Sequence, residues 1–367
     1  MKRIGIFGSG QLGQMIAEEA RRLGHQIFCY SPDANSPSAK VGVSEVVGSY
    51  DNLQKISEFA QSVDIITFEF ENIPKITLEF LNSNFSVKVF PNPDALVIAQ
   101  DRYLEKSKFR ELGFLTANFF LLNKDTKENA DPFPFPWIIK TLRFGYDGKG
   151  QFKINSRKDY EHFLEFAFTD AKSEYLIEEV VPFQKEISVV LTRFIDGSVS
   201  SFGAIENIHK NHILDLSIFP AEIPPEIATK ANGMAKALAE NLRYVGTMGV
   251  EFFIKDSVVY LNEFAPRPHN SGHFSQDCGS HSQFLLHTLA ILGYSAPKFI
   301  YPNPTVMKNI LGNDYNKSIT LANILSASDS RYRLHLYSKE DAKPNRKMGH
   351  INFTGKIIDT DSRFLEI

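Results

Sequence analysis

The stretch GVEFFIKDSVVYLNEF, residues 249–264, sets two glutamates in an otherwise apolar pair of strand-like segments. Valine, isoleucine, tyrosine and phenylalanine crowd both sides of Lys255–Ser257, which predicts a β-hairpin that turns there. Because side chains alternate between the faces of a strand, the register of the hairpin decides where Glu251 and Glu263 point. The predicted register of this hairpin therefore determines whether the two glutamates can form one site.

We expect Ile254 to face Val258 across the turn. In that register Glu251 faces Leu261, and Glu263 is the diagonal neighbour of Glu251 on the same face. Two carboxylates that converge on an apolar surface repel each other and lose hydration, unless a cation joins them or they share a proton. Mg²⁺ prefers carboxylate and phosphate oxygens, so the pair predicts a magnesium–nucleotide site. The alternative is that one acid faces solvent at the end of the sheet.

Polar and titratable residues follow the hairpin directly, in a loop that Pro266 and Pro268 hold extended. A lone histidine in such a loop is more often a hydrogen-bonded structural residue. Several such groups beside a carboxylate pair instead suit a doubly charged anion and a polar substrate lying against a nucleotide. The residues are Arg267, His269, Asn270, Ser271 and His273.

A second glycine-rich segment, residues 134–154, runs from an apolar strand into Lys140, through a loop, and back into a strand. It lacks the Walker sequence, and a strand, not a helix, follows the loop directly. A glycine loop between antiparallel strands can cover polyphosphate with backbone N–H groups, while a lysine at the strand end supplies a positive charge. The arrangement suits ATP; an ordinary glycine-rich hairpin with a solvated lysine is the alternative.

The next segment, EYLIEEVVPFQKEISVVL at 174–191, is a strand pair interrupted by Pro182, which removes one ladder donor. Backbone groups freed in this way can pair with the edge of adenine, which leaves Glu186 to accept hydrogen bonds from ribose. The alternative is that Glu178 and Glu179 lie on a solvated strand edge.

The N-terminal stretch, residues 3–30, predicts a strand, a glycine turn, a helix and a second strand. Its GxGxxG pattern, Gly8 to Gly13, lies where backbone amides at a helix N-terminus favour an anion. The second strand ends in Tyr30 and Ser31 without the acid that binds ribose in dinucleotide-binding proteins, which argues against NAD. We expect an anion or nucleotide contact here, and the alternative is that the glycines only permit tight strand-to-helix packing.

The composition fits a multidomain protein without extensive nucleic-acid or membrane contacts. The chain has 367 residues, a formal net charge of −3 and two cysteines without metal-ligand spacing. A weakly acidic chain is not drawn to nucleic acid or to anionic membrane as a whole. We expect a soluble, unexported protein of the cytoplasm.

The motifs, taken in order, resemble those of the 5-(carboxyamino)imidazole ribonucleotide synthetases, the ATP-grasp carboxylases of purine biosynthesis. The resemblance covers nearly the whole chain and is most specific between Asn262 and Asp277. It rests on GSGQLGQM, TFEFENIP, DR, KTLRFGYDGKGQ, EEVVPFQKEISV, ENIHKN, NEFAPRPHNSGHFSQD and NRKMGHIN.

This resemblance implies a fold of α/β and α+β class with three domains, in a cytoplasmic homodimer. The domains are expected at 1–98 (Rossmann-like), 99–296 (ATP-grasp) and 297–367 (small, β-rich). The implied reaction joins bicarbonate to aminoimidazole ribonucleotide with ATP and Mg²⁺, and yields the carbamate, ADP and phosphate. The alternative within the same fold is an ATP-grasp ligase with a different acceptor.

The resemblance also implies roles for individual residues. Those expected to be catalytic are Asp147, Arg267, His269 and Lys347. The ATP contacts are expected from Arg102, Lys140, Gly145, Tyr146, Asp147, Gly148, Lys149, Gly150, Gln151, Glu178, Glu179, Val180, Val181, Glu186, His209, Asn262 and Glu263. The ribonucleotide contacts are expected from Gln11, Leu12, Tyr146, Asn270, Arg346 and Lys347, and the metal ligands are Glu251 and Glu263. Lys149 stands where relatives commonly have arginine, which removes a planar fork of donors.

Overall fold

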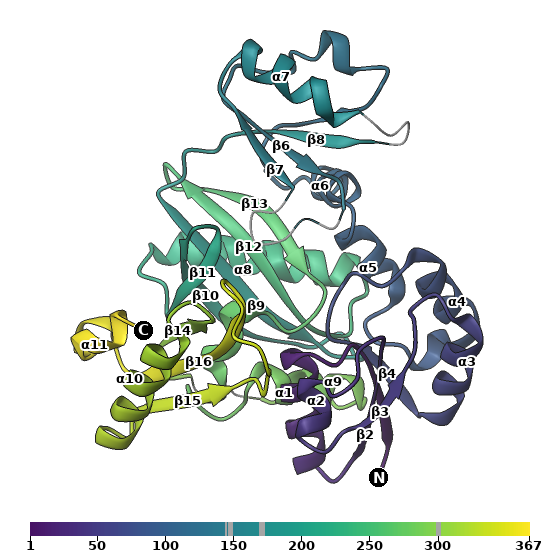
Figure 1. Cartoon of the computed structure of the whole chain (residues 1–367), viewed down its shortest axis with the longest axis vertical. Coiled ribbons are helices and arrows are strands. Elements are labelled where there is room, and N and C mark those ends of the chain that lie inside the picture. The colour runs from purple at the N-terminus through teal and green to yellow at the C-terminus, as the bar shows by residue number, and fades with distance from the viewer. Residues whose placement is uncertain (144, 146–149, 169–172, 299–301) are drawn as a thin grey trace.

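The computed structural model describes residues 1–143, 145, 150–168, 173–298 and 302–367, whose strands form three sheets (Figure 1). No helix in this described part of the chain is long and apolar enough to cross a membrane. The fold class expected from the sequence, mixed α/β and α+β, is confirmed.

The first sheet is parallel, has the strand order β3-β2-β1-β4 and is flanked by helices. Helix α1 starts after the glycine turn and ends where Gly24, at φ 84°, takes the left-handed conformation that commonly closes a helix. The elements are β1 (Arg3–Phe7), α1 (Gln11–Arg22), β2 (Gln26–Ser31), α2 (Pro37–Lys40), β3 (Ser44–Val47), α3 (Leu53–Ser62), β4 (Ile65–Phe68), α4 (Lys75–Phe85), η1 (Ser86–Lys88) and α5 (Pro93–Ala99).

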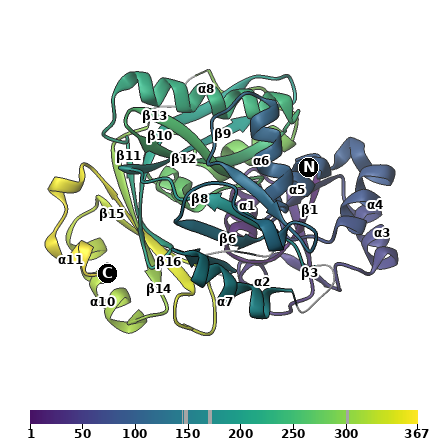
Figure 2. The same cartoon turned by 90° about the horizontal axis from the view of Figure 1, so that it is seen from above.

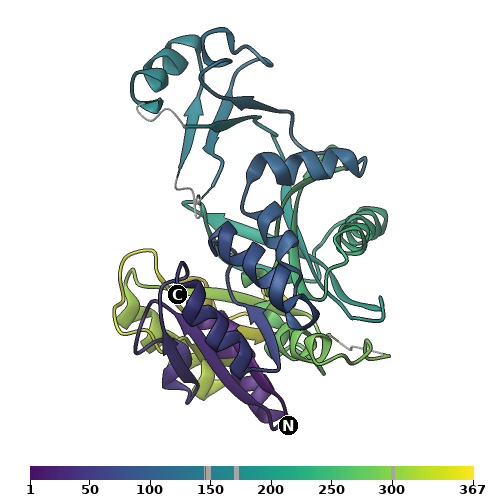
Figure 3. The same cartoon turned by 90° about the vertical axis from the view of Figure 1, so that its right-hand side faces the viewer.

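Helix α6 (Arg102–Glu111) leads from this unit to a small antiparallel sheet of order β5-β8-β6-β7. Asp101 caps α6 by accepting from the backbone N–H groups of Tyr103 and Leu104, as its position predicts. The small sheet packs against α7 around the buried Trp137 and stands apart from the other sheets (Figures 1 and 3). Its elements are β5 (Phe119–Leu122), η2 (Lys127–Asn129), β6 (Trp137–Thr141), β7 (Gln151–Ile154), α7 (Arg157–Ala167) and β8 (Tyr175–Glu179).

The large sheet has eight strands in the order β13-β12-β9-β10-β11-β14-β16-β15. Alternate residues of its central strands pack on α8 on one face and beneath α9 and η3 on the other. Along β12, Val250 and Phe252 belong to the α8 face, so Glu251 lies on the opposite face. The elements are β9 (Lys185–Arg193), β10 (Val199–Lys210), β11 (Ile213–Phe219), α8 (Pro225–Asn241), β12 (Gly246–Lys255), β13 (Val258–Ala265), η3 (Asn270–Gln276) and α9 (Gln283–Ile291).

The C-terminal strands extend this same sheet, because β14 pairs antiparallel with β11. In Figure 2 the C-terminal α10 and α11 lie at the end of the molecule opposite α3 and α4. The C-terminal strands thus form the edge of the large sheet opposite the hairpin. The elements are β14 (Thr305–Leu311), α10 (Tyr315–Ser328), β15 (Tyr332–Leu336), β16 (Lys347–Thr354), η4 (Ile357–Asp359) and α11 (Ser362–Leu365).

Candidate active site

The hairpin turns more tightly than its sequence predicts. Asp256 and Ser257 both have positive φ, at 50° and 63°, so that Lys255 pairs with Val258. This register corrects the expected pairing of Ile254 with Val258. A two-residue turn matches the twist of the flanking strands better than the three-residue turn that we expected.

A β-bulge then restores the convergence of the two acids. The register shifts between Glu251 and Phe252, where Asn262 is left as the extra residue of β13. Glu251 therefore pairs directly with Glu263 and not with Leu261. Without the bulge, Glu251 would pair with Asn262, and Glu263 would point to the other face.

Each glutamate has a cationic or protonatable neighbour. Glu251 Oε1 lies 3.2 Å from His269 Nε2, and Glu263 Oε2 lies 3.5 Å from a terminal nitrogen of Arg102. Burial alone would raise the pKa of Glu251, but the hydrogen bond from His269 and nearby positive charges lower it. The carboxylate of Glu251 is thus held ionised although it is buried.

A third carboxylate, Glu186 on β9, belongs to the same face. Its pKa is raised by burial and by the negative charges of Glu251 and Glu263, which outweigh the lowering influence of His209. His209 Nδ1 lies 3.0 Å from Glu186 Oε2. This excess of negative charge suits a divalent cation.

The donor set fits magnesium that is shared with a phosphate ligand. Glu251 and Glu263 provide carboxylate oxygens from paired positions, and Mg²⁺ is commonly held by one or two carboxylates plus substrate phosphates. Among the described residues, no group of three or more histidine, cysteine, aspartate or glutamate side chains is placed to hold a metal ion. The assignment of the two hairpin glutamates as metal ligands stays a prediction.

Lys140 belongs to a buried charge cluster between the small sheet and α6 that is centred on Glu178. Its Nζ donates to Glu178 Oε2 at 2.8 Å, and Lys106 Nζ lies 3.9 Å from the same oxygen. Although burial by itself would raise the pKa of Glu178, the positive charges of Lys106 and Lys140 lower it to about 2. Both lysines therefore face an ionised carboxylate at neutral pH.

The glycine loop between β6 and β7 is anchored at both of its ends. Arg102 donates to the carbonyl of Gly145 at 3.3 Å, and Lys140 pairs with Gln151 across the sheet. Gly150 has φ 73°, the left-handed conformation that glycine adopts readily. Tyr146, Asp147, Gly148 and Lys149 lie outside the described residues, so their expected roles stay predictions.

The predicted adenine-binding segment joins the small sheet to the large one. Strand β8 ends at Glu179, whose carboxylate accepts from Asn118 at 2.7 Å, and Val180 and Val181 follow outside any strand. Strand β9 resumes at Lys185, so the interruption around the proline is confirmed.

Arg267 forms a two-pronged ion pair with Glu71, a residue that follows β4 in the N-terminal unit. Its Nε and one terminal nitrogen each donate to a different oxygen of Glu71. Although burial alone would raise the pKa of Glu71, the positive charge of Arg267 lowers it. The loop after the hairpin is thereby tied to the edge of the first sheet.

Asn270 is a candidate ligand-binding residue of the same loop. Its two amide atoms are buried, and neither has a hydrogen-bond partner among the described residues. A buried amide without partners is unusual in a folded protein and suits a polar ligand.

The glycine fingerprint is occupied by the protein itself. Glu69 accepts from the backbone N–H of Gly10 at 2.5 Å and of Gly13 at 2.7 Å. An added Cβ at Gly8 or Gly10 would meet this side chain. The carboxylate of Glu69 thus takes the place of the expected anion at these two amides, and the expected ligand contacts of Gln11 and Leu12 stay predictions.

A cleft of about 650 Å³ opens between this turn and the C-terminal strands. Gln11 and Arg346 both line it, which brings together two residues that are far apart in the sequence. Lys339, also in the cleft, has its pKa lowered to about 8 by burial and by the charge of Arg346. Leu12 lies instead in the hydrophobic core, where its side chain is 7% exposed.

Lys347 begins β16 beside the cleft. Its backbone carbonyl accepts from Lys339 Nζ at 2.6 Å, and its charge helps to lower the pKa of Glu251. The C-terminal strands thus bring a lysine to the carboxylate face of the sheet.

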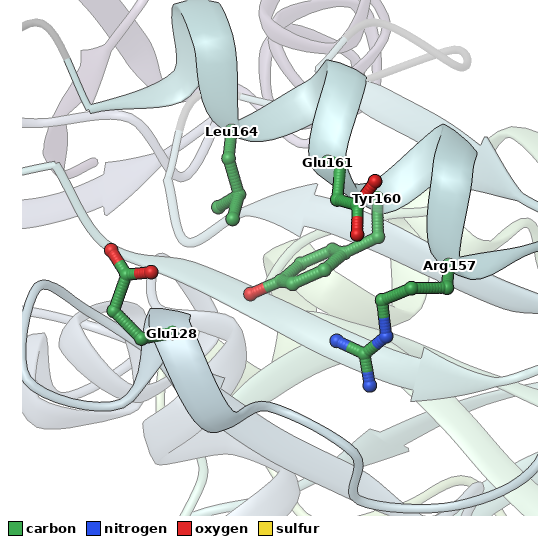
Figure 4. A pocket seen from close by; sticks show the side chains of 5 residues that line it. All are labelled: Glu128, Arg157, Tyr160, Glu161 and Leu164. Carbon is green, nitrogen blue, oxygen red and sulfur yellow. The ribbon is translucent and has the colours of Figure 1, made fainter.

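A second pocket, of about 410 Å³, lies on the small sheet's outer helix (Figure 4). Glu128, Arg157, Tyr160, Glu161 and Leu164 line it, and none of them was predicted as a site residue. We assign it no part in the chemistry.

Comparison with known proteins agrees with this geometry. A curated relative from Brucella melitensis, named N5-carboxyaminoimidazole ribonucleotide synthase, is 38% identical over 95% of both chains. One from Bacillus subtilis with the same name is 35% identical over 95% of this chain and 90% of the relative. The chain belongs to the N5-carboxyaminoimidazole ribonucleotide synthase family. It is therefore an ATP-grasp ligase.

Family models match three successive parts of the chain, and a solved structure covers all of it. Residues 1–100 match the ribonucleotide synthetase preATP-grasp domain, 107–284 the ATP-grasp domain, and 305–360 the phosphoribosylaminoimidazole carboxylase C-terminal domain. A crystal structure of an ADP complex of N5-carboxyaminoimidazole ribonucleotide synthetase superposes with a TM-score of 0.90 at 39% identity, covering 100% of this chain and 94% of the other. A crystal structure of an Aspergillus clavatus N5-carboxyaminoimidazole synthase in complex with ADP and 5-aminoimidazole ribonucleotide has a TM-score of 0.86 at 29% identity, and the match covers 97% of this chain and 94% of the other.

Sequence reasoning missed several residues that organise the synthase site. Glu69 and Glu71 were not predicted as site residues, although they follow β4 at the carboxyl edge of a parallel sheet, where functional groups commonly lie. Lys106 carries no local signal, because a lysine on an amphipathic helix is normally read as solvated. It is 1% exposed here, and only the packing of α6 against β13 reveals its role.

Proposed function

We propose that this synthase uses ATP and bicarbonate to carboxylate 5-aminoimidazole ribonucleotide, and that it releases ADP and phosphate. The observation that carries the proposal is the direct pairing of Glu251 with Glu263. This pair lies between the Lys140–Glu178 ion pair and the loop after the hairpin (the Arg267 loop), in which Arg267 binds Glu71. One side of this pair suits a nucleotide and the other suits a small anion with an acceptor.

ATP lies between the small and the large sheet in this proposal. Arg102 and Lys140 face its phosphates, the segment from Glu178 to Val181 contacts adenine, and Glu186 with His209 contacts the ribose. Glu251 and Glu263 hold Mg²⁺, with Asn262 beside them, and the ion neutralises charge on the phosphate oxygens when bound.

The ribonucleotide occupies the region from the Arg267 loop to the cleft. The partnerless amide of Asn270 suits a polar group of this substrate. Gln11 and Arg346 line the cleft and Lys347 begins the neighbouring strand, so we assign all three to the ribonucleotide. Leu12 contributes through the position of its backbone, because its side chain is buried in the core.

The chemistry begins with bicarbonate, which is a poor electrophile. One of its oxygens attacks the γ-phosphorus of ATP, ADP leaves, and carboxyphosphate forms while Lys140 stabilises the charge on the transferred phosphoryl group. Arg267, His269 and Lys347 hold the carboxyphosphate as it decomposes to carbon dioxide and phosphate. Exclusion of water keeps the carbon dioxide available to the amine.

The exocyclic amine of the ribonucleotide then attacks the carbon of carbon dioxide to form the N–C bond. The amine loses one proton, for which we propose Asp147 as the acceptor. Tyr146 and Lys149 of the same loop contact the substrates in this scheme.

We further propose that the synthase acts as a homodimer in the cytoplasm, with domain boundaries near residues 98 and 296. The family resemblance supports the dimer and the location. The boundary near 296 falls between the family matches that end at 284 and resume at 305, and the boundary near 98 falls just inside the end of the match to residues 1–100.

Coupled detection of ADP tests the reaction, with ATP, bicarbonate and aminoimidazole ribonucleotide each omitted in turn. We expect full turnover only with all three present. ADP release that needs another amine or carboxylate acceptor, and not the ribonucleotide, would favour a different ATP-grasp ligase.

A further inference from the structure

His269 is held in place by contacts to both its backbone and its ring. Its backbone N–H donates to Gln283 Oε1 and its carbonyl accepts from Gln283 Nε2, both at 2.8 Å. An added Cβ at Gly249 would lie 2.5 Å from His269 Cβ, so the histidine packs on β12 where only glycine leaves room. The imidazole thus has little freedom to move relative to Glu251.

Two buried hydroxyls continue from the ring into the sheet. His269 Nδ1 lies 2.8 Å from Ser271 Oγ, and Ser271 Oγ lies 2.6 Å from Ser188 Oγ. Both serines are 0% exposed, so bulk solvent does not reach either contact. Each hydroxyl has a single proton, so the direction of one hydrogen bond sets the direction of the next.

The backbone selects one of the two directions. The N–H of Ser271 points at His269 Nδ1 from 3.4 Å, and a protonated Nδ1 would oppose it. The reverse direction would let Ser188 donate to Asn207 Oδ1, a contact that is equally long at 3.4 Å, but it would also set two donors against each other at Nδ1. The favoured direction therefore runs from Ser188 to Ser271 to Nδ1, and the ring proton resides on Nε2.

We propose that Ser271, supported by Ser188, is a positioning residue that fixes the ring of His269 with Nδ1 as a hydrogen-bond acceptor and with the ring proton on Nε2, facing Glu251. The hydrogen bond at one imidazole nitrogen decides whether the other nitrogen carries the ring proton. The consequence for catalysis rests on the proposed function, in which His269 holds the carboxyphosphate. The tautomer itself does not depend on that function.

Nitrogen-15 NMR of the full-length protein, labelled at histidine, tests the tautomer directly. The signals of His269 are those that vanish in His269→Gln. We expect the Nε2–H pattern in the unsubstituted protein and a mixture of both tautomers in Ser271→Ala. Ser188→Ala, which leaves the contact with the ring intact, is expected to shift the signals in the same direction and serves if Ser271→Ala does not fold.

Ser275→Ala is the matched control, because Ser275 is an equally buried serine of η3 whose hydroxyl bonds to Gly272 and Gln283 and not to the ring. We expect Ser271→Ala to lower kcat for ADP release roughly tenfold relative to this control, with the KM for ATP little changed. An Nδ1–H pattern in the unsubstituted protein, or a tautomer and kcat in Ser271→Ala equal to those of Ser275→Ala, overturns the proposal. Failure of the unsubstituted protein to use aminoimidazole ribonucleotide would instead overturn the proposed function and leave the NMR result standing.

Discussion

Glu251 lies directly opposite Glu263 because the single residue Asn262 bulges out of β13. Two adjacent residues of α6 hold the two sides of this bulge. Lys106 Nζ donates to the carbonyl of Asn262 at 2.6 Å, and Glu105 accepts from the backbone N–H of Phe264 at 2.8 Å. Helix α6 therefore supports the register on which the carboxylate pair depends.

Replacing Lys106 by methionine is expected to destabilise the fold by about 1.5–3 kcal/mol, because it removes a charged hydrogen bond to the bulge and a cation beside Glu178. Urea denaturation measures the change. Lys108→Met is the control, since among the described residues Lys108 forms an ion pair only with Glu111 on the same helix, a pair that contributes little to stability. Equal midpoints for the two variants would contradict the role assigned to Lys106.

Glu263→Gln is expected to reduce ADP release roughly a hundredfold or more, because one of the two carboxylates that hold Mg²⁺ loses its charge. Initial rates over a range of Mg²⁺ concentrations measure the effect, and the rate should respond to higher Mg²⁺ than in the unsubstituted protein. The matched variant is Glu206→Gln, because Glu206 pairs with Ile187 and so faces the α8 side of the sheet. An unchanged Mg²⁺ dependence in Glu263→Gln would remove this residue from the metal site.

The stability due to Glu178 is expected to depend on pH. Its pKa of about 2 in the folded chain lies below the ordinary value of 4.5, so its contribution is fully present above about pH 4.5 and is lost as the pH falls towards 2. The shift corresponds to roughly 3 kcal/mol. Urea midpoints of the unsubstituted protein and Glu178→Gln should differ at pH 7 and approach each other near pH 3. A gap that is constant over this range would refute the assignment.

The glycine turn is expected to tolerate no side chain at Gly8, where φ is 104° and an added Cβ would collide with Glu69. Gly8→Ala should destabilise the fold by about 3 kcal/mol. By contrast, Gly233→Ala on α8 meets nothing within 4 Å and should stabilise it by up to about 1 kcal/mol. Thermal unfolding of the two variants compares them under identical conditions.

NADH is expected not to bind at this turn, because Glu69 already accepts from the amides of Gly10 and Gly13. A fluorescence titration of the unsubstituted protein with NADH should show no saturable change. Saturable NADH binding that becomes tighter in Glu69→Gln would contradict the prediction. It would show that a dinucleotide can displace the Glu69 carboxylate from the turn.

Arg267→Lys is expected to lower ribonucleotide-dependent ADP release by roughly tenfold to a hundredfold, because lysine cannot form the two-pronged contact with Glu71. The KM for ATP should change little, since this pair lies on the acceptor side. Glu71→Gln and the double variant complete a cycle. Effects that simply add would indicate that the two residues act independently.

Much of this architecture follows from local patterns in the chain. Residues within a single element or its turn predict the strands around Lys140, the β-hairpin and the N-cap at Asp101. Apolar periodicity and turn residues depend on only a few neighbouring positions, so they can be recognised in the sequence without knowledge of the tertiary structure. The density of polar residues after Asn262 likewise marks the site.

Only the tertiary structure decided which groups meet. The bulge at Asn262 alters the register of the hairpin by one residue. The contact of Glu69 with the glycine turn and the contact between Ser188 and Ser271 each join segments that are distant in the sequence. A one-residue shift turns every later side chain to the other face of a strand, and periodicity alone cannot reveal it. The sequence thus determined the groups available to the site, while packing between elements determined how they are paired.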